Sequence, residues 1–189
     1  MDASNAQAAY LALGSNLGDR EALLRRAVEL LWASDGLEIL ASSRVFETAP
    51  VGPPPQGPYL NAVLRVCTVR SPRALLDRML EIESLCGRDR REETRWGPRN
   101  LDLDLLLYSD WCIDEAGLKL PHPRMHERSF VLEPLCDLAP DEQHPRFRVA
   151  FGELALRARS EGAVSLWPCA PLLRDAEAPA EPGTELRPR

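Results

Sequence analysis

The 189-residue sequence predicts a single α+β domain. Segments with the alternating pattern of strands and segments with helical periodicity follow one another in the order strand, helix, strand, strand, helix, strand. The composition is that of an ordinary globular protein, with 44% hydrophobic and 28% charged residues. We expect residues 1–169 to fold as one domain. Residues 170–189 carry proline, alanine and charge without periodicity, and we expect a disordered tail there.

A strand, a helix and a second strand are expected at the start of the chain. Residues 8–16, AAYLALGSN, have the composition of a short buried strand that ends in a Gly-Ser-Asn turn. A helix follows from Asp19, a residue type that caps helices, and Gly36 marks its end. Residues 37–48 alternate between apolar and polar side chains, which predicts the second strand.

The same order of strand, helix and strand is then repeated. Residues 59–70 alternate like a strand and follow a stiff proline-rich connection at 49–58. Residues 71–87 form a helix with serine as its cap, proline at its first position and glycine at its end. Residues 101–108, LDLDLLLY, form the last strand, and the βαββαβ order predicts a ferredoxin-like fold, an antiparallel sheet with helices packed on it. The remaining expected elements are a hairpin over 111–120 and helices over 127–139 and 151–160.

Charge and cysteine content limit the partners that we expect. The formal net charge of −6 argues against general affinity for nucleic acid or for an anionic membrane. Lys119 is the only lysine among 23 basic residues, so any phosphate site must use arginine. The five cysteines form no CxxC pair, and the sequence shows no signal peptide and no apolar run of membrane length. We therefore expect a cytoplasmic protein with small-molecule partners.

Two aspartates lie in the apolar strand that follows residue 100. Asp102 and Asp104 are separated by one leucine, so in a strand both point to one face, about 7 Å apart at Cα. At roughly 5 Å two carboxylates repel by about 3 kcal/mol at an effective dielectric near 20, so positive charge is expected opposite them. They either solvate the outer face together with surface arginines or hold a hard cation such as Mg²⁺. The expected outer face holds Asp102, Asp104, Leu106 and Tyr108, and the expected core face holds Leu101, Leu103, Leu105 and Leu107.

A cluster of arginines precedes this strand. Such a cluster is usually a solvated loop, but this one leads directly into the two carboxylates and contains a Trp-Gly-Pro turn. Carboxylates for a metal ion followed by flexible arginines are what phosphoryl transfer requires. The sequence has neither a P-loop nor the glycine loop of protein kinases. The arginines are Arg88, Arg90, Arg91, Arg95 and Arg99.

Two further groups of polar residues are less informative. Tyr59 and Asn61 alternate onto one face at the start of a strand, where a solvent-facing tyrosine and a turn asparagine would serve equally well. His122 and His126 are four residues apart, but Pro123 disfavours a continuous helix through both. No third ligand is suitably spaced, so we do not expect a zinc site.

Four segments, taken together, resemble the successive signatures of the 6-hydroxymethyl-7,8-dihydropterin pyrophosphokinase (HPPK) family. The resemblance extends from about Tyr10 to Pro140. It implies a ferredoxin-like fold and the Mg²⁺-dependent transfer of diphosphate from ATP to a pterin alcohol in folate biosynthesis, with release of AMP. The segments are GSNLGDR (14–20), ETAPVGPPPQGPYLNAV (47–63), RWGPRNLDLD (95–104) and LPHPRMHERSFVLEPL (120–135).

The resemblance also implies roles for individual residues. Asp102 and Asp104 would bind two Mg²⁺ ions that bridge the ATP phosphates, and Arg88 and Arg99, on mobile loops, would join them as catalytic residues. Asp102 is also the candidate general base. The implied ATP-binding residues are Glu83, Arg88, Arg90, Trp96, Arg99, Leu105, His122 and Arg128. The implied pterin-binding residues are Thr48, Val51, Tyr59, Asn61, Trp96 and Phe130. The positions that depart from the family pattern, all on the adenine side, are Leu80, Gly117, Lys119 and Pro123.

Two other functions fit the same residues. A non-catalytic ferredoxin-like module would bind a small ligand without consuming ATP. A Mg²⁺-dependent phosphohydrolase would use the same aspartates and release phosphate or diphosphate to water. Formation of AMP that depends on the pterin distinguishes both from a pyrophosphokinase.

Overall fold

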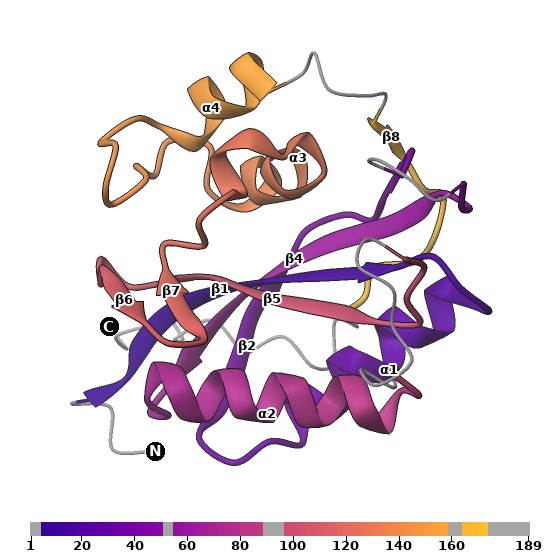
Figure 1. The fold of residues 1–189 in the computed structure, drawn as a ribbon, viewed down its shortest axis with the longest axis horizontal. Helices are drawn as coiled ribbons and strands as arrows, with labels where there is room; N and C mark the ends of the chain where they lie inside the picture. The colour runs from indigo at the N-terminus through magenta and orange to yellow at the C-terminus, as the bar shows by residue number, and fades with distance from the viewer. Residues whose placement is uncertain (1–4, 51–54, 89–96, 159–163, 174–189) are drawn as a thin grey trace, which may run out of the picture.

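The computed structural model describes residues 5–50, 55–88, 97–158 and 164–173, and it has the expected α+β architecture (Figure 1). One six-stranded sheet has the order β5-β1-β4-β3-β8, with β2 also paired to β4, and its strand pairs are antiparallel. The ferredoxin-like order is therefore confirmed, with the expected second strand divided into β2 and β3. The bounds are β1 Gln7–Ser15, β2 Leu37–Ser42, β3 Phe46–Thr48, β4 Tyr59–Thr68, β5 Asp102–Tyr108 and β8 Val164–Leu166.

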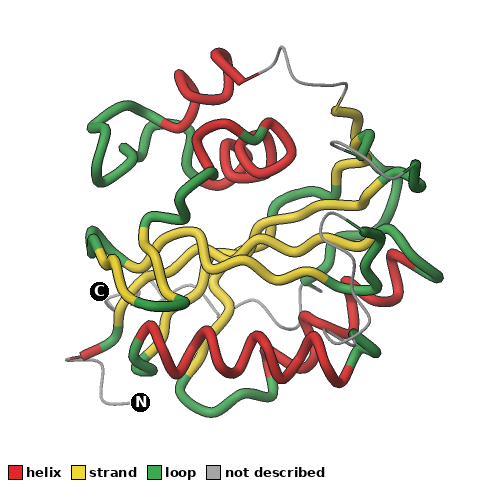
Figure 2. Tube along the Cα trace, viewed as in Figure 1, coloured by secondary structure: helices red, strands yellow, loops and turns green. Residues whose placement is uncertain are grey.

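Helices cover both faces of the sheet (Figures 1 and 2). The helices α1 (Arg20–Trp32) and α2 (Pro72–Leu85) lie on one face, and α3 (Ser129–Leu138) and α4 (Phe151–Ala158) lie on the other. The expected hairpin is formed by β6 (Ile113–Glu115) and β7 (Leu118–Leu120), and the short 3-10 helix η2 (Met125–Glu127) precedes α3. None of the helices in the described ranges has the length and apolar character that crossing a bilayer requires.

The helix caps follow the local sequence. The Asp19 side chain accepts a hydrogen bond from the Ala22 amide at 3.0 Å, and the Ser71 hydroxyl accepts one from the Ala74 amide at 3.3 Å. The helix α1 ends at Trp32, before the expected Gly36, which instead forms the turn into β2 with φ of +71°. A positive φ suits glycine because it has no Cβ. Both helix starts were therefore correctly predicted.

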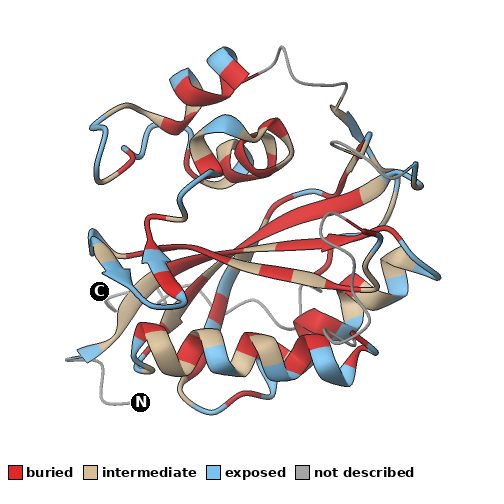
Figure 3. Cartoon of the chain, viewed as in Figure 1, coloured by how far each residue is buried: buried red, intermediate tan, exposed pale blue. Residues whose placement is uncertain are grey.

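Two apolar cores lie on opposite sides of the sheet (Figure 3). The first core, between the sheet and α1 and α2, includes Leu11, Leu24 and Met79. The second core, under α3 and α4, includes Val63 and Phe151. The sequence did not predict that α3 and α4 would cover the second face, and this coverage decides where the sheet stays accessible.

An irregularity in β5 corrects the expected faces of this strand. The pairing of β5 with β1 shifts between Tyr10 and Leu11, so that Leu106 is one extra residue on β5. Leu106 and Leu107 both join the second core, and Tyr108 joins the first. The expectation that Leu107 lies with the core leucines and Tyr108 with the aspartates is therefore wrong, because a β-bulge reverses the alternation beyond it.

The chain beyond α4 returns to the sheet. The strand β8 pairs with β3, which the sequence did not predict. Leu172, with 4% of its surface exposed, belongs to the first core, and Leu173 packs against it. The packed chain therefore extends past residue 169, where we expected it to end. The predicted disordered tail was 170–189, and of these residues 174–189 lie outside the described residues.

Candidate active site

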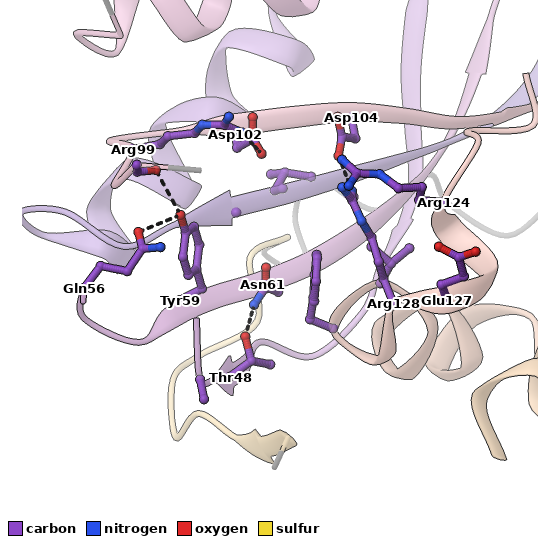
Figure 4. A pocket seen from close by; sticks show the side chains of 17 residues that line it. Thr48, Gln56, Tyr59, Asn61, Arg99, Asp102, Asp104, Arg124, Glu127 and Arg128 are labelled. Atoms are coloured by element: carbon purple, nitrogen blue, oxygen red, sulfur yellow. Dashed lines mark hydrogen bonds and ion pairs between the residues drawn. The ribbon is translucent and has the colours of Figure 1, made fainter. Parts of the chain in front are cut away.

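A pocket of about 320 Å³ opens on the sheet face that also carries α3. Three neighbouring strands form its floor. On this face of each strand, an apolar residue of the second core is followed, toward the pocket, by polar or small residues. Tyr10, Val63 and Leu106 belong to the second core, and the next residues on the same face line the pocket. These pocket residues are Ala12 and Gly14 on β1, Asn61 and Tyr59 on β4, and Asp104 and Asp102 on β5 (Figure 4).

Gly14 separates two pocket side chains across the sheet. Its Cα pairs with Asn61 on one side and with Asp102 on the other, so the three residues form one row. Neighbouring strands lie about 4.8 Å apart, which places Asn61 and Asp102 roughly 10 Å apart at Cα. A Cβ at Gly14 would lie 3.3 Å from Asn61 Oδ1, so the absence of a side chain leaves the floor open between them.

Arginines neutralise the two carboxylates. Arg88 Nη1 lies 2.6 Å from Asp102 Oδ1, and Arg99 Nη1 lies 2.8 Å from Asp102 Oδ2. Arg128 Nη1 lies 3.2 Å from Asp104 Oδ2. These contacts provide the positive charge that two same-facing aspartates require. Figure 4 also shows the side chain of Arg124 reaching toward Asp104 beside Arg128. We call Arg99, Asp102, Asp104, Arg124 and Arg128 the charged end of the pocket.

Arg88 is buried beneath Asp102 and does not line the pocket. It also forms an ion pair with Glu83, and Glu83 Oε1 accepts a hydrogen bond from the Leu103 amide at 2.7 Å. Both side chains are almost fully buried, and buried charges of this kind require such partners. Leu105 lies in the first core on the same side of the sheet. The resemblance implies that Glu83 and Leu105 contact the nucleotide, but neither residue lines this pocket.

His122 is a neutral neighbour of Asp104. Its Nε2 lies 3.9 Å from Asp104 Oδ2, and its Nδ1 accepts a hydrogen bond from the Arg124 amide at 3.4 Å. Burial lowers the pKa of His122 below its usual value, and the negative charge of Asp104 only partly opposes this. Burial likewise lowers the pKa of Arg128, although a guanidinium stays charged in proteins. With Nδ1 as acceptor, neutral His122 carries its proton on Nε2, on the side of Asp104.

Neutral side chains line the opposite end of the pocket. Asn61 is buried and donates from Nδ2 to Thr48 Oγ1 at 2.8 Å. The Tyr59 hydroxyl donates to Gln56 Oε1 at 3.3 Å and lies 3.5 Å from the Gly97 carbonyl oxygen. Phe130 lines the same pocket from α3. We call Thr48, Gln56, Tyr59, Asn61 and Phe130 the neutral end.

Asn16 connects the segments that border the pocket. Its Oδ1 accepts a hydrogen bond from the backbone amide of Arg99 at 2.7 Å, and its backbone amide donates to the Arg99 carbonyl oxygen at 3.1 Å. Its Nδ2 donates to Gln56 Oε1 at 2.9 Å. One side chain at the end of β1 thus holds residues that precede β5 and residues that precede β4.

The pocket brings most of the expected site residues together. Val51, Arg90 and Trp96 lie outside the described residues, so the structure says nothing of them. The sequence interpretation missed Gln56, Arg124 and Glu127, which line the pocket, and Asn16, which borders it. Arg124 and Glu127 fall between His122 and Arg128, which it had selected. The expected residues that line the pocket are Thr48, Tyr59, Asn61, Arg99, Asp102, Asp104, Arg128 and Phe130.

Carboxylates with guanidinium groups on one wall of a pocket are typical of phosphoryl-transfer enzymes. Residues 10–140 match the family described as 7,8-dihydro-6-hydroxymethylpterin-pyrophosphokinase (HPPK). The chain belongs to this family.

Relatives agree with this assignment, and a solved structure is similar in fold. The 2-amino-4-hydroxy-6-hydroxymethyldihydropteridine pyrophosphokinase of Bacillus subtilis (strain 168) is 46% identical over 130 residues, which cover 69% of this chain and 77% of the relative. The pyrophosphokinase of the same name from Methylorubrum extorquens is 45% identical over 133 residues, which cover 70% and 83%. A crystal structure of Plasmodium falciparum HPPK-DHPS is similar in fold, with a TM-score of 0.63 at 15% identity over 82% of this chain. The chain spans only 45% of that longer protein.

Proposed function

We propose that this chain transfers the β,γ-diphosphate of ATP to the hydroxymethyl oxygen of 6-hydroxymethyl-7,8-dihydropterin and releases AMP, as a step in folate biosynthesis. One observation carries the proposal: a single pocket joins two arginine-paired carboxylates to a neutral end with aromatic and amide side chains. Membership of the HPPK family and the names of the relatives support it. A triphosphate requires the first kind of surface, and an uncharged flat heterocycle requires the second.

The neutral end would bind the pterin. A pterin is a flat ring with a guanine-like edge, so the aromatic faces of Tyr59 and Phe130 suit its faces. Asn61 is oriented by its hydrogen bond to Thr48, and an amide offers both a donor and an acceptor to such an edge. Because Asn61 and Asp102 lie in one row with Gly14 between them, a pterin at Asn61 would point across Gly14 toward the charged end.

The charged end would bind the triphosphate, with two Mg²⁺ ions held by Asp102 and Asp104. The donors fit this metal, because Asp102 and Asp104 line one pocket and Mg²⁺ prefers carboxylate oxygens together with phosphate and water oxygens, which would complete the coordination. Three oxygens of the two carboxylates already accept hydrogen bonds from guanidinium groups, so a positive charge is favoured there. When bound, Mg²⁺ would neutralise and polarise the phosphate oxygens.

The arginines and His122 would act on the phosphates. A guanidinium group released from Asp102 or Asp104 can bind phosphate oxygens in bidentate fashion, which suits Arg99 and Arg128 at the pocket surface. Arg124 would add positive charge beside Arg128, and neutral His122 would donate a hydrogen bond from Nε2. Catalysis would come mainly from positioning and charge neutralisation. Asp102, the carboxylate in the row of Asn61, remains our candidate acceptor for the proton of the attacking hydroxyl.

The deciding experiment is an incubation with ATP, Mg²⁺ and hydroxymethyl-dihydropterin, with nucleotides and pterins separated afterwards. We expect equal amounts of AMP and pterin diphosphate, and no AMP when the pterin is omitted. Release of phosphate or diphosphate without the pterin would instead identify a phosphohydrolase. Pterin binding without ATP consumption would identify a ligand-sensing module. Either result would overturn the proposal.

The number of metal ions and the location of the protein are finer parts of the proposal. Two ions predict that Mn²⁺, which is paramagnetic, binds with a stoichiometry of two in the presence of a non-hydrolysable ATP analogue, and that Asp104→Asn reduces this stoichiometry. A cytoplasmic location remains a prediction from the sequence. Small-molecule substrates are what the family acts on.

A further inference from the structure

Residues 164–173 lie outside the part of the chain that matches the family, and they pack against the border of the pocket. We call them the C-terminal strap. Its first residues form β8 on the outer edge of β3, and the Trp167 amide donates to the Val45 carbonyl at 2.9 Å. Farther along, the Arg25 guanidinium donates to the Ala170 carbonyl at 2.7 Å. The strap thus fastens α1 to the edge of the sheet.

The strap supports a very short strand of the neutral end. The strand β3 has three residues and ends at Thr48, whose hydroxyl accepts the hydrogen bond of Asn61. It pairs with β4 on one side and with β8 on the other, where Val164 lies opposite Thr48. Without β8 it would be a three-residue edge strand held on one side only, and such strands open easily.

A tryptophan of the strap also holds an arginine that ties this region together. The Arg20 guanidinium lies over the Trp167 ring, 5.1 Å from its centroid, and the Trp167 indole donates to Glu21 Oε2 at 3.1 Å. Arg20 Nη1 lies 2.9 Å from Glu47 Oε1 and 2.8 Å from the Pro58 carbonyl oxygen. Glu47 precedes Thr48 and Pro58 precedes Tyr59, so Arg20 contacts the chain just before the proline-rich connection and also at its last residue.

From these contacts we propose that the C-terminal strap sets the geometry of the pterin side of the pocket, with Trp167 and Arg20 as positioning residues. Neither residue lines the pocket, and each acts through Thr48, Asn61 and Tyr59. The strap pairs with β3 at one edge of the sheet, and the two aspartates lie on β5 at the opposite edge, so we expect the affinity for ATP to stay unchanged. The inference rests on the proposed function, because it names the substrate whose binding depends on the strap.

The first test separates the two substrates kinetically. Trp167→Leu removes the cation–π contact and the indole hydrogen bond, and we expect the KM for the pterin to rise about tenfold. We expect kcat and the KM for ATP to stay within about twofold of wild type. Trp167→Phe keeps a ring under Arg20 and should recover much of the loss. Arg20→Gln should resemble Trp167→Leu, because it removes the same link from the other side.

Each residue has a matched control, one adjacent in the chain and one on the same helix. Leu166→Ala changes an exposed side chain on β8, and Arg26→Ala removes an exposed ion pair on α1, so both should behave as wild type. Melting temperatures of all variants show whether a loss reflects general unfolding. Parallel increases in both KM values, or a pterin KM unchanged in Trp167→Leu and in Arg20→Gln, would overturn the inference.

The second test does not depend on catalysis. Hydrogen exchange in the absence of substrates should be at least about fivefold faster in Trp167→Leu at the amides of residues 46–48 and 59–61, and unchanged in β5. Equal protection in wild type and variant would overturn the positioning role. If the wild type forms no pterin-dependent AMP, the proposed function fails, whereas faster exchange confined to 46–48 and 59–61 would still support the strap as the element that orders this wall.

Discussion

The two ends of the pocket are built in different ways. At the charged end, Asp102 and Asp104 are partly exposed, and their arginines come from three separate segments. At the neutral end, Asn61 and Thr48 lie on paired neighbouring strands and bond to each other in a buried position. Ion pairs that water can reach, such as those of Arg99 and Arg128, exchange partners at low cost, whereas a buried hydrogen bond between strands does not. The charged end therefore suits a ligand that brings its own ions, and the neutral end is preformed for one ligand shape.

The largest effect should follow removal of charge from either aspartate. Asp102→Asn and Asp104→Asn preserve shape but remove the anions that would hold Mg²⁺. We expect turnover to fall at least about 1,000-fold, which corresponds to about 4 kcal/mol of transition-state stabilisation, as measured by AMP formation. Asp110→Asn, at an exposed turn beyond β5, is the matched control. Near-normal turnover of either site variant in Mg²⁺ would refute the metal assignment.

The next effect concerns an arginine whose partner we expect to change. Arg99→Ala should lower kcat by about 100-fold and raise the KM for ATP much less, because its charge is needed most when phosphate charge develops in the transition state. Arg99→Lys should recover only part of the rate, since an ammonium group cannot bind two oxygens in the same planar geometry. Steady-state kinetics with varied ATP measures both. A change confined to the KM for ATP would show that Arg99 acts only in ground-state binding.

The neutral end should respond through the pterin alone. Asn61→Ala should raise the KM for the pterin by about 30-fold, because it removes the buried amide that would read the pterin edge. Thr48→Val removes only the acceptor that orients this amide, and about a fivefold increase is expected. Both variants should leave the KM for ATP unchanged. If the KM for ATP rose equally, the two ends would not be separate binding surfaces.

Low pH would also lower the stability of the whole protein, because it acts on a histidine away from the pocket. Burial, helped by the charges of His126 and Arg146, lowers the pKa of His144 to about 4. The unfolded state, with a pKa near 6.5, binds the proton more tightly, so stability is complete above about pH 6.5 and decreases as the pH falls toward 4.

The expected loss from His144 is modest. Between pH 7 and pH 5 we expect the free energy of unfolding to fall by about 1 kcal/mol, after allowance for solvent screening. Urea denaturation at both pH values measures it. In His144→Asn, which retains an acceptor for the amides of Arg146 and Phe147, this part of the pH dependence should disappear. An unchanged pH dependence in the variant would show that other groups cause it.

Local pattern predicted much of the fold. The element order, the caps at Asp19 and Ser71 and the shared face of Asp102 and Asp104 were all readable, because each depends on neighbours in sequence. The bulge at Leu106 was not readable, since an extra residue leaves a run of leucines looking regular. The pairing of β8 with β3 joins residues more than a hundred positions apart and has no local signal.

The site was predictable to the extent that motif residues line it. Asp102, Asn61 and Arg128 were selected from the sequence and lie in one pocket. Asn16 and Gln56 were missed because their value lies in a contact between two loops, which no periodicity reveals. Arg88 was expected on a mobile loop with the phosphates, but it is buried between Glu83 and Asp102. A charged residue next to an arginine-rich loop gives no local sign that it points inward.

Asn16 links the charged end of the pocket to the neutral end. It bonds both to Arg99, at the charged end, and to Gln56, at the neutral end. A substrate that shifts either segment must break or strengthen bonds that the other segment shares. Such sharing is a source of cooperativity between co-substrates, and thermodynamic linkage makes it mutual: whatever factor ATP applies to pterin affinity, the pterin applies to ATP.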